Sequence, residues 1–178
     1  MMRRCKDIEN EIIHQILFCE LCFDVCNSIK IIPGRGADFL PYFYNLNFVK
    51  GIILLHSLLL STKKSELSIK KYISKRKEDN LTANNDGIKN FEKYINLISV
   101  EFKESFPISL RNKIGGHLDE NYRHTDFISA YIMPKLVPEY VKITSELKDT
   151  FFKFCNHSMD VPFPKLREQI DEILQIIK

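Results

Sequence analysis

The sequence predicts an all-α protein, a helical bundle of four to five main helices with short accessory helices, in a single domain over residues 1–178. Over several long stretches, apolar residues recur at spacings of three and four, which is the helical period. No stretch shows the strict alternation of apolar and polar residues that is typical of a strand. With 44% hydrophobic and 28% charged residues, a chain of 178 residues is long enough to bury one core.

A long first helix is expected over residues 7–29. Its apolar residues follow the helical period, and acidic residues such as Glu9 are available for a wetter side. Three cysteines fall on one stripe of this helix: Cys19, Cys22 and Cys26. A metal or iron–sulfur site could use such a stripe, but the apolar neighbours favour small buried residues.

Residues 31–47 are predicted to form an ordered loop, because they contain Pro33, Gly34, Gly36 and Pro41. The aromatic residues of this loop could stack on nucleic-acid bases, but a lid packed onto the bundle is the favoured interpretation. Residues 46–61 are expected to form a second helix that is apolar nearly all round and therefore central. His56, inside this helix, is interpreted as a core residue, with support of a functional site as the alternative.

A basic amphipathic helix is expected over residues 62–77. Its lysines and arginine far outnumber its one acidic residue, which is the pattern of a contact with a phosphate backbone. The alternative is an ordinary solvated surface. The residues proposed to bind RNA here are Lys70, Lys71, Lys75 and Arg76. A polar loop is predicted over residues 78–86.

The helical period returns over residues 86–104, which are predicted to form the third main helix. A further helix is expected to start at Thr125 or Asp126. Because Pro134 and Pro138 fall inside it, they must either kink it or divide it, leaving a helix from about Val137 to Phe154. A short terminal helix is expected over residues 165–177.

Composition and charge point to a cytoplasmic protein. The N-terminal residues mix both charge signs and lack the apolar core of a signal peptide, and the most apolar run is too short to cross a bilayer. Five cysteines make an odd number, so reduced thiols are the simplest expectation. The net charge of +3 permits an anionic partner but does not demand one.

Residues 110–120 bring together side chains that are suited to catalysis. Arg111 offers a planar fork of donors that fits a phosphate, and Asn112 adds an amide beside it. His117 can take or give a proton near neutral pH, and Asp119 could orient its imidazole. On an unbroken helix Arg111 and His117 would lie about 120° apart. The two glycines between them must therefore loosen the segment, or another helix or subunit must complete the pair.

Residues 111–117, R-N-K-I-G-G-H, resemble the signature of the HEPN superfamily, in which an arginine, a polar residue and four further residues precede a histidine. This superfamily supplies the domain of many prokaryotic toxin and abortive-infection ribonucleases. The resemblance implies a helical bundle, a homodimer and metal-independent cleavage of RNA that leaves a 2′,3′-cyclic phosphate. It also implies that Arg111 stabilises the phosphate, that His117 acts as general acid or base, and that Asn112 fills the polar position.

The prediction from the sequence is therefore a metal-independent endoribonuclease of a toxin or antiviral defence system, without a cofactor. Supporting roles fall to Asp119 and Glu120, and Lys113 joins the RNA-binding residues. An antitoxin or a defence-system protein is a possible partner. The main alternative is a catalytically inactive HEPN-like scaffold that binds nucleotide, nucleic acid or a partner protein.

Two other interpretations of the same stretch remain open. Arg111 could pair with a nearby acidic residue such as Asp119 or Glu120 in a purely structural role. A metal cluster would use His117, Asp119, Glu120 and His124, which are suitable ligand types but meet no standard zinc or di-iron spacing.

Overall fold

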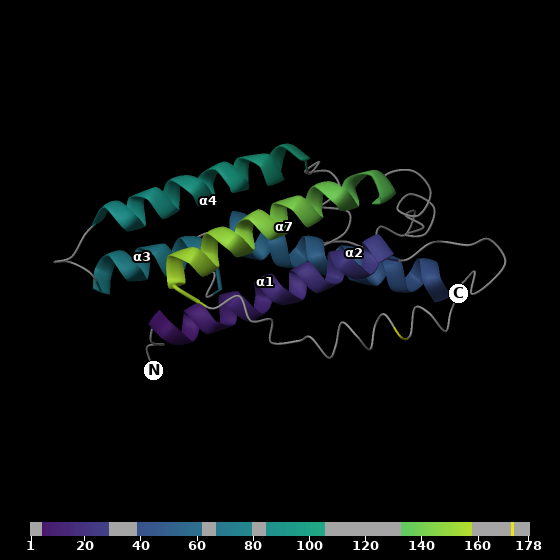
Figure 1. Ribbon diagram of the computed structural model, residues 1–178, viewed down its shortest axis with the longest axis horizontal. Helices are drawn as coiled ribbons and strands as arrows, with labels where there is room; N and C mark the ends of the chain where they lie inside the picture. The colour runs from purple at the N-terminus through teal and green to yellow at the C-terminus, as the bar shows by residue number, and fades with distance from the viewer. Residues whose placement is uncertain are drawn as a thin grey trace, which may run out of the picture.

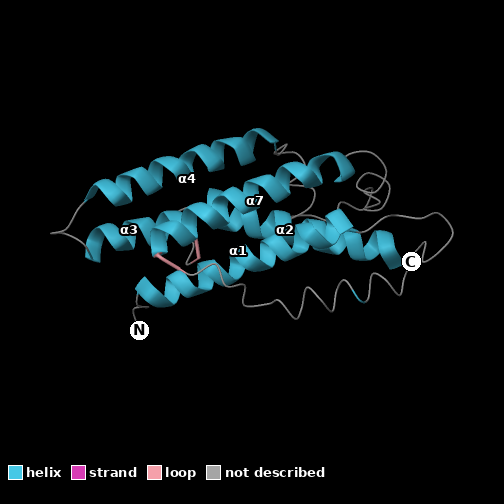
Figure 2. Cartoon of the chain, viewed as in Figure 1, coloured by secondary structure: helices cyan, strands magenta, loops and turns pink. Residues whose placement is uncertain are grey.

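The computed structural model describes residues 5–28, 39–61, 67–79, 85–105 and 133–157, together with Glu172. Five long helices occupy these ranges, and the same ranges contain no strand (Figure 2). They are α1 (Cys5–Ser28), α2 (Phe39–Leu60), α3 (Ile69–Asp79), α4 (Asn85–Ser105) and α7 (Met133–Cys155). The predicted all-α class is confirmed. The predicted terminal helix over residues 165–177 lies outside the described residues, apart from helical Glu172.

The long helices lie side by side along the longest axis of the molecule (Figure 1). α1 and α4 run in one direction, and α2 and α7 run in the other. α1 packs on α2 and α7, α7 also packs on α4, and the shorter α3 covers one end of the bundle against α1 and α4. None of the described helices combines the length and the apolar character that crossing a lipid bilayer requires.

An aromatic cluster holds α1, α2, α4 and α7 together. The ring of Phe23 stacks on Tyr140 at 5.5 Å between centroids and meets Phe48 edge-on at 6.1 Å, while Phe102 lies 6.0 Å from Tyr140. All four residues are fully buried. α2 approaches α1 closely because Gly51 has no side chain: a Cβ there would lie 2.7 Å from the Phe23 ring. This glycine therefore sets the spacing of the two helices.

The three cysteines on one stripe of α1 are small core residues, as predicted. Cys19, Cys22 and Cys26 are buried free thiols. Cys19 Sγ donates to the carbonyl of Gly51, and Cys26 Sγ donates to the carbonyl of Tyr44. Burial raises the pKa of all three thiols, that of Cys22 to about 11. They therefore stay protonated at neutral pH.

The predicted loop over residues 31–47 is wrong for its second part, because α2 begins at Phe39. Pro41 does not prevent this, since it stands in the first turn, where a backbone N–H has no partner within the helix. Tyr44 is buried and its ring stacks on Phe48 at 6.3 Å, so this aromatic residue belongs to the core. Residues 31–38 lie outside the described residues.

The basic helix is shorter at its start and longer at its end than predicted. α3 begins at Ile69, after Ser68, whose hydroxyl accepts a hydrogen bond from the backbone N–H of Lys71 and so caps the helix. It continues to Asp79 and α4 begins at Asn85, so the predicted polar loop over residues 78–86 is wrong at its first two and its last two residues. α1 and α4 match their predicted ranges within two residues.

α7 is one continuous helix, so of the two expected effects of the prolines, a kink or a division near Val137, the division is wrong. Pro134 falls in the first turn, and Pro138 is exposed, so its ring faces away from the core. The helix ends at Cys155 and is followed by Asn156, whose φ of 51° is left-handed. His157 N–H donates to the carbonyl of Phe152 at 2.9 Å, and the two rings meet edge-on. This is a Schellman motif, which satisfies carbonyls that a helix end leaves open.

Candidate functional site

The predicted catalytic stretch lies outside the described residues. This holds for Arg111, Asn112, Lys113, His117, Asp119 and Glu120, and also for His124 of the metal alternative. Their roles stay predictions. The structure does describe the two helix ends that this stretch connects, which are the end of α4 at Ser105 and the start of α7 at Met133.

These two points lie at the same end of the bundle. The hydroxyl of Tyr140, two turns into α7, donates to the carbonyl of Ser105 at 3.3 Å. The Tyr140 ring also meets that of Phe102, in the last turn of α4. The antiparallel helices α4 and α7 are therefore fastened to each other where the connection over residues 106–132 leaves and rejoins them (Figure 1).

The basic helix α3 lies at the opposite end. Lys77 of α3 pairs with Glu92 of α4 at 2.6 Å, and the Tyr72 ring lies 5.4 Å from that of Phe151 in α7. From Tyr140 to Phe154, α7 runs for about 21 Å at about 1.5 Å per residue. The two regions that sequence reasoning connected with RNA are therefore attached to different ends of the bundle.

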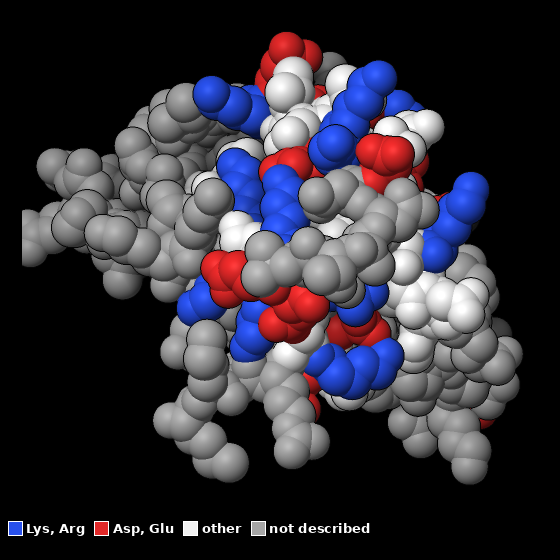
Figure 3. Space-filling model, turned by 90° about the vertical axis from the view of Figure 1, so that its left-hand side faces the viewer, with Lys and Arg blue, Asp and Glu red and all other residues white. Residues whose placement is uncertain are grey.

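The basic residues of α3 are partly engaged in packing. Lys70, Lys71, Lys75 and Arg76 are all half-buried. The guanidinium of Arg76 lies over the rings of Tyr72 and Phe154, at 5.8 and 5.7 Å, as cation–π contacts require. Figure 3 shows this end of the molecule, where Lys and Arg alternate with Asp and Glu over the described surface. The face is mixed in charge rather than uniformly basic.

A buried polar cluster joins α1, α3 and α7. The hydroxyl of Tyr72 donates to Oε2 of Glu9 at 2.6 Å and lies 3.5 Å from Cys155 Sγ, and Lys6 pairs with the same carboxylate. Burial acts to raise the pKa of Glu9, but the hydrogen bonds from Lys6 and Tyr72 outweigh it, and the pKa is lowered overall. Burial raises the pKa of the Cys155 thiol to about 12, so it is a poor nucleophile.

The expectation that Glu9 lies on a wetter side is wrong, because only 4% of the residue is exposed. The signal was present in the sequence. Position 9 precedes Ile12 by three residues and Ile13 by four, which places it on the apolar face of the helix. A carboxylate in that position requires partners from other helices, and the sequence alone does not identify them.

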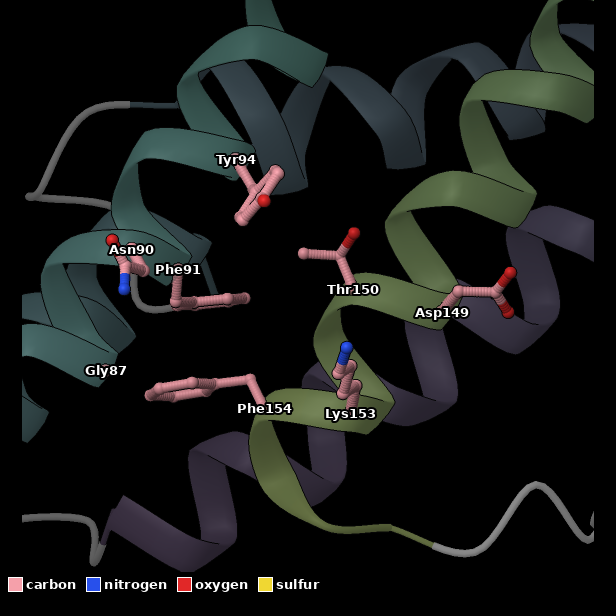
Figure 4. Close-up of a pocket in the computed structure, with 8 residues that line it drawn as sticks. All are labelled: Gly87, Asn90, Phe91, Tyr94, Asp149, Thr150, Lys153 and Phe154. Atoms are coloured by element: carbon pink, nitrogen blue, oxygen red, sulfur yellow. The ribbon is translucent and has the colours of Figure 1, made fainter.

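A groove of about 480 Å³ opens between α4 and α7 (Figure 4). Its floor is the stacked pair of Phe91 and Phe154, 4.0 Å apart and nearly parallel. Lys153 and Thr150 face it from α7, Tyr94 stands at its edge, and the Asp149 carboxylate turns away from α4. Sequence reasoning missed this groove, because it arises from two helices that are distant in the chain.

Metal ligands do not gather in the described part of the chain, where no three histidine, cysteine, aspartate or glutamate residues could hold an ion together. His56, interpreted as a core residue, is only half-buried within α2, and the alternative that it supports a functional site is not tested by the described residues. The sequence matches no protein-family model, and comparison with curated proteins and with solved structures also finds no match.

Proposed function

We propose that this chain is a metal-independent endoribonuclease of a toxin or phage-defence system, acting on RNA in the cytoplasm as a homodimer. The observation that carries the proposal is the string R-N-K-I-G-G-H at residues 111–117, which resembles the HEPN signature. Its setting supports the proposal: the string belongs to the connection between two packed, antiparallel helices of an all-helical bundle.

The proposed reaction is transesterification at the RNA backbone. A histidine such as His117 removes the proton of a ribose 2′-hydroxyl, and the 2′-oxygen attacks the adjacent phosphorus. The bond from phosphorus to the 5′-oxygen breaks, and that oxygen receives a proton from a second acid, supplied by His117 of the other copy. Arg111 offsets the added negative charge on the phosphate oxygens. The products are a 2′,3′-cyclic phosphate and a 5′-hydroxyl.

The remaining predicted residues assist this chemistry. Asn112 would hydrogen-bond the phosphate, and Asp119 or Glu120 would hold the imidazole of His117 in position. Lys113 would attract the RNA backbone close to the reaction. Lys70, Lys71, Lys75 and Arg76 would contact more distant phosphates, since α3 packs at the other end of the bundle.

The test is incubation of purified protein with total RNA in the presence of a chelator. We expect cleavage that Arg111→Ala and His117→Ala each abolish, with loss of at least about two orders of magnitude in rate. Matched controls are Arg123→Ala and His124→Ala, which remove the same residue types outside the signature and should retain activity. Equal activity in all variants would indicate a contaminating nuclease and contradict the proposal.

A catalytically inactive scaffold is the second candidate, favoured by the aromatic groove between α4 and α7. Aromatic surfaces beside basic side chains suit the binding of unpaired bases. In that case RNA would bind but stay intact, and binding would weaken in Tyr94→Ala and Lys153→Ala, because both side chains line the groove. An antitoxin or defence-system protein is a further possible partner of either form.

A further inference from the structure

The groove between α4 and α7 has a lining that suits a planar apolar ring. Its volume of about 480 Å³ falls within the range of small-molecule sites. The apolar side chains that line it are Phe91, Phe154 and Tyr94, all of them aromatic. The first two stack face to face at 4.0 Å, and Tyr94, at the edge of the groove, is 59% exposed (Figure 4). Aromatic faces and edges of this kind favour contact with a further planar ring.

One end of the groove is open because of Gly87. This residue lies in the first turn of α4 and lines the groove. A Cβ at this position would meet no atom within 4 Å. Because the protein leaves this space empty, a ligand can enter it. A side chain introduced at residue 87 would occupy the same space without displacing its neighbours.

Three polar side chains of the groove have no hydrogen-bond or ion-pair partner among the described residues. They are Asn90, Thr150 and Lys153. Comparable side chains of α7 outside the groove are engaged: Thr144 donates to the carbonyl of Tyr140 at 2.7 Å, and Lys142 pairs with Glu101 at 2.7 Å. The groove therefore brings together hydrogen-bond donors that the described part of the fold does not use.

The groove carries the charge of one cation. Lys153 faces it from α7, whereas the carboxylate of Asp149, the one acidic group among the described residues that line it, turns away from α4 (Figure 4). Lys153 and Thr150 stand three residues apart on the same side of the helix, so an ammonium and a hydroxyl can reach one anionic group. A single positive charge balances a carboxylate, whereas a phosphate monoester carries about two negative charges.

We propose that this groove binds a small aromatic carboxylate. The ring of the ligand packs against the aromatic lining, and its carboxylate accepts hydrogen bonds from the Lys153 ammonium and the Thr150 hydroxyl. Asn90 offers its amide from α4 to a polar substituent of the ring. An unpaired RNA base is the competing occupant, but each further nucleotide brings a phosphate that a lining with one cation does not match. The inference goes beyond the proposed ribonuclease function and does not depend on it.

The test is titration of the full chain with indoleacetate, followed by fluorescence anisotropy. The chain has no tryptophan, so the indole fluorescence comes from the ligand alone. Indoleacetamide, the neutral isostere, should bind about tenfold more weakly, and tryptamine, whose ammonium would meet that of Lys153, more weakly still. Phenylacetate should displace indoleacetate at lower concentrations than cyclohexylacetate does, because the latter carries the same carboxylate on a saturated ring.

Variants of the lining locate the bound ligand. Lys153→Met keeps the length of the side chain without its charge, so it should bind indoleacetate about tenfold more weakly and no better than indoleacetamide. Gly87→Leu fills the open end and should weaken binding by about tenfold or more. It should not lower the thermal stability, because leucine favours a helix more than glycine does. Lys142→Met is the matched control, since Lys142 is an exposed lysine of α7 outside the lining, and it should bind like wild type.

The proposal is overturned if indoleacetate does not bind, if it binds no more tightly than tryptamine, or if Gly87→Leu binds it like wild type. A labelled 2′-O-methyl RNA oligonucleotide, which cannot be cleaved through its 2′-oxygen, tests the competing occupant. Its binding should be unchanged in Gly87→Leu and Lys153→Met. If both variants lose the oligonucleotide and indoleacetate does not displace it from wild type, the groove binds RNA and the proposal is wrong. Circular dichroism checks that each variant stays helical.

Discussion

Two buried clusters hold the bundle together in different ways. The aromatic cluster around Phe23 packs rings from four helices. The polar cluster around Glu9 is also buried, but it contains a carboxylate, a phenol and a thiol. Both clusters join α1 to α7. The aromatic cluster depends on close packing, because a smaller side chain would leave a cavity that lowers the free energy of unfolding. The polar cluster depends on its hydrogen bonds, because a buried carboxylate without partners is costly.

This contrast shows which substitutions each region tolerates. In the aromatic cluster, an apolar residue of similar volume should be accepted at little cost. In the polar cluster, the loss of a single atom that donates a hydrogen bond should be felt although the volume hardly changes. Three measurements of protein stability distinguish the two clusters, and they follow from the largest expected effect to the smallest.

The largest effect is expected for Phe23→Ala. This change removes a fully buried ring that touches Phe48 and Tyr140, and it should lower the free energy of unfolding by about 3–5 kcal/mol. Phe18→Ala is the matched control, because Phe18 lies on the same helix and is exposed. Chemical denaturation measures both. Similar losses in the two variants would contradict the packing that places Phe23 in the core.

A smaller effect is expected for Tyr72→Phe. It deletes the one oxygen that donates to Glu9 and leaves the ring contacts with Phe151 in place, so the free energy of unfolding should fall by about 1–3 kcal/mol. Tyr94→Phe makes the same chemical change at an exposed position and should have almost no effect on stability. If both variants unfold like wild type, the hydroxyl of Tyr72 does not support the carboxylate.

The smallest effect is expected in the dependence of stability on pH. Because the pKa of Glu9 is lowered in the folded state, its contribution is present above the ordinary carboxyl pKa and is lost as the pH falls through the lowered value. Glu9→Gln should therefore destabilise the protein at pH 7 and flatten the acid limb of the stability curve. Glu78→Gln, at an exposed position of α3, is the control. Denaturant titrations from about pH 7 to pH 3 test this, and an unchanged acid limb would contradict it.

The sequence predicted a helix best where the apolar residues of that helix alone follow the helical period over a long stretch. α1 and α4 are long and amphipathic, so their spans were predictable within two residues. Pro41 misled the prediction of α2, because proline ends helices in their interior but is compatible with a first turn. The groove over Phe91 and Phe154 depends on the packing of α4 against α7, which a pattern along the chain does not contain.

For the candidate site, too, residue types and spacing could be read from the sequence, whereas contacts between helices could not. Arg111 and His117 were singled out by residue type and spacing, and their roles stay predictions. Arg76 was chosen for its charge alone, whereas its guanidinium lies over two aromatic rings. The number of basic residues along a helix does not show which of them pack against other helices, because those contacts depend on neighbours from α1, α4 and α7.

The hydrogen bond from Tyr140 to Ser105 also bears on how this protein could change over evolution. Where two helices are already joined, the chain between them can lengthen at little cost, since each doubling of a flexible loop adds about 0.6 kcal/mol of closure entropy. Residues 106–132 occupy such a position. We expect insertions between Ser105 and Met133 to leave the packing of α4 against α7 intact, because Tyr140 joins the two helices without the help of the connection.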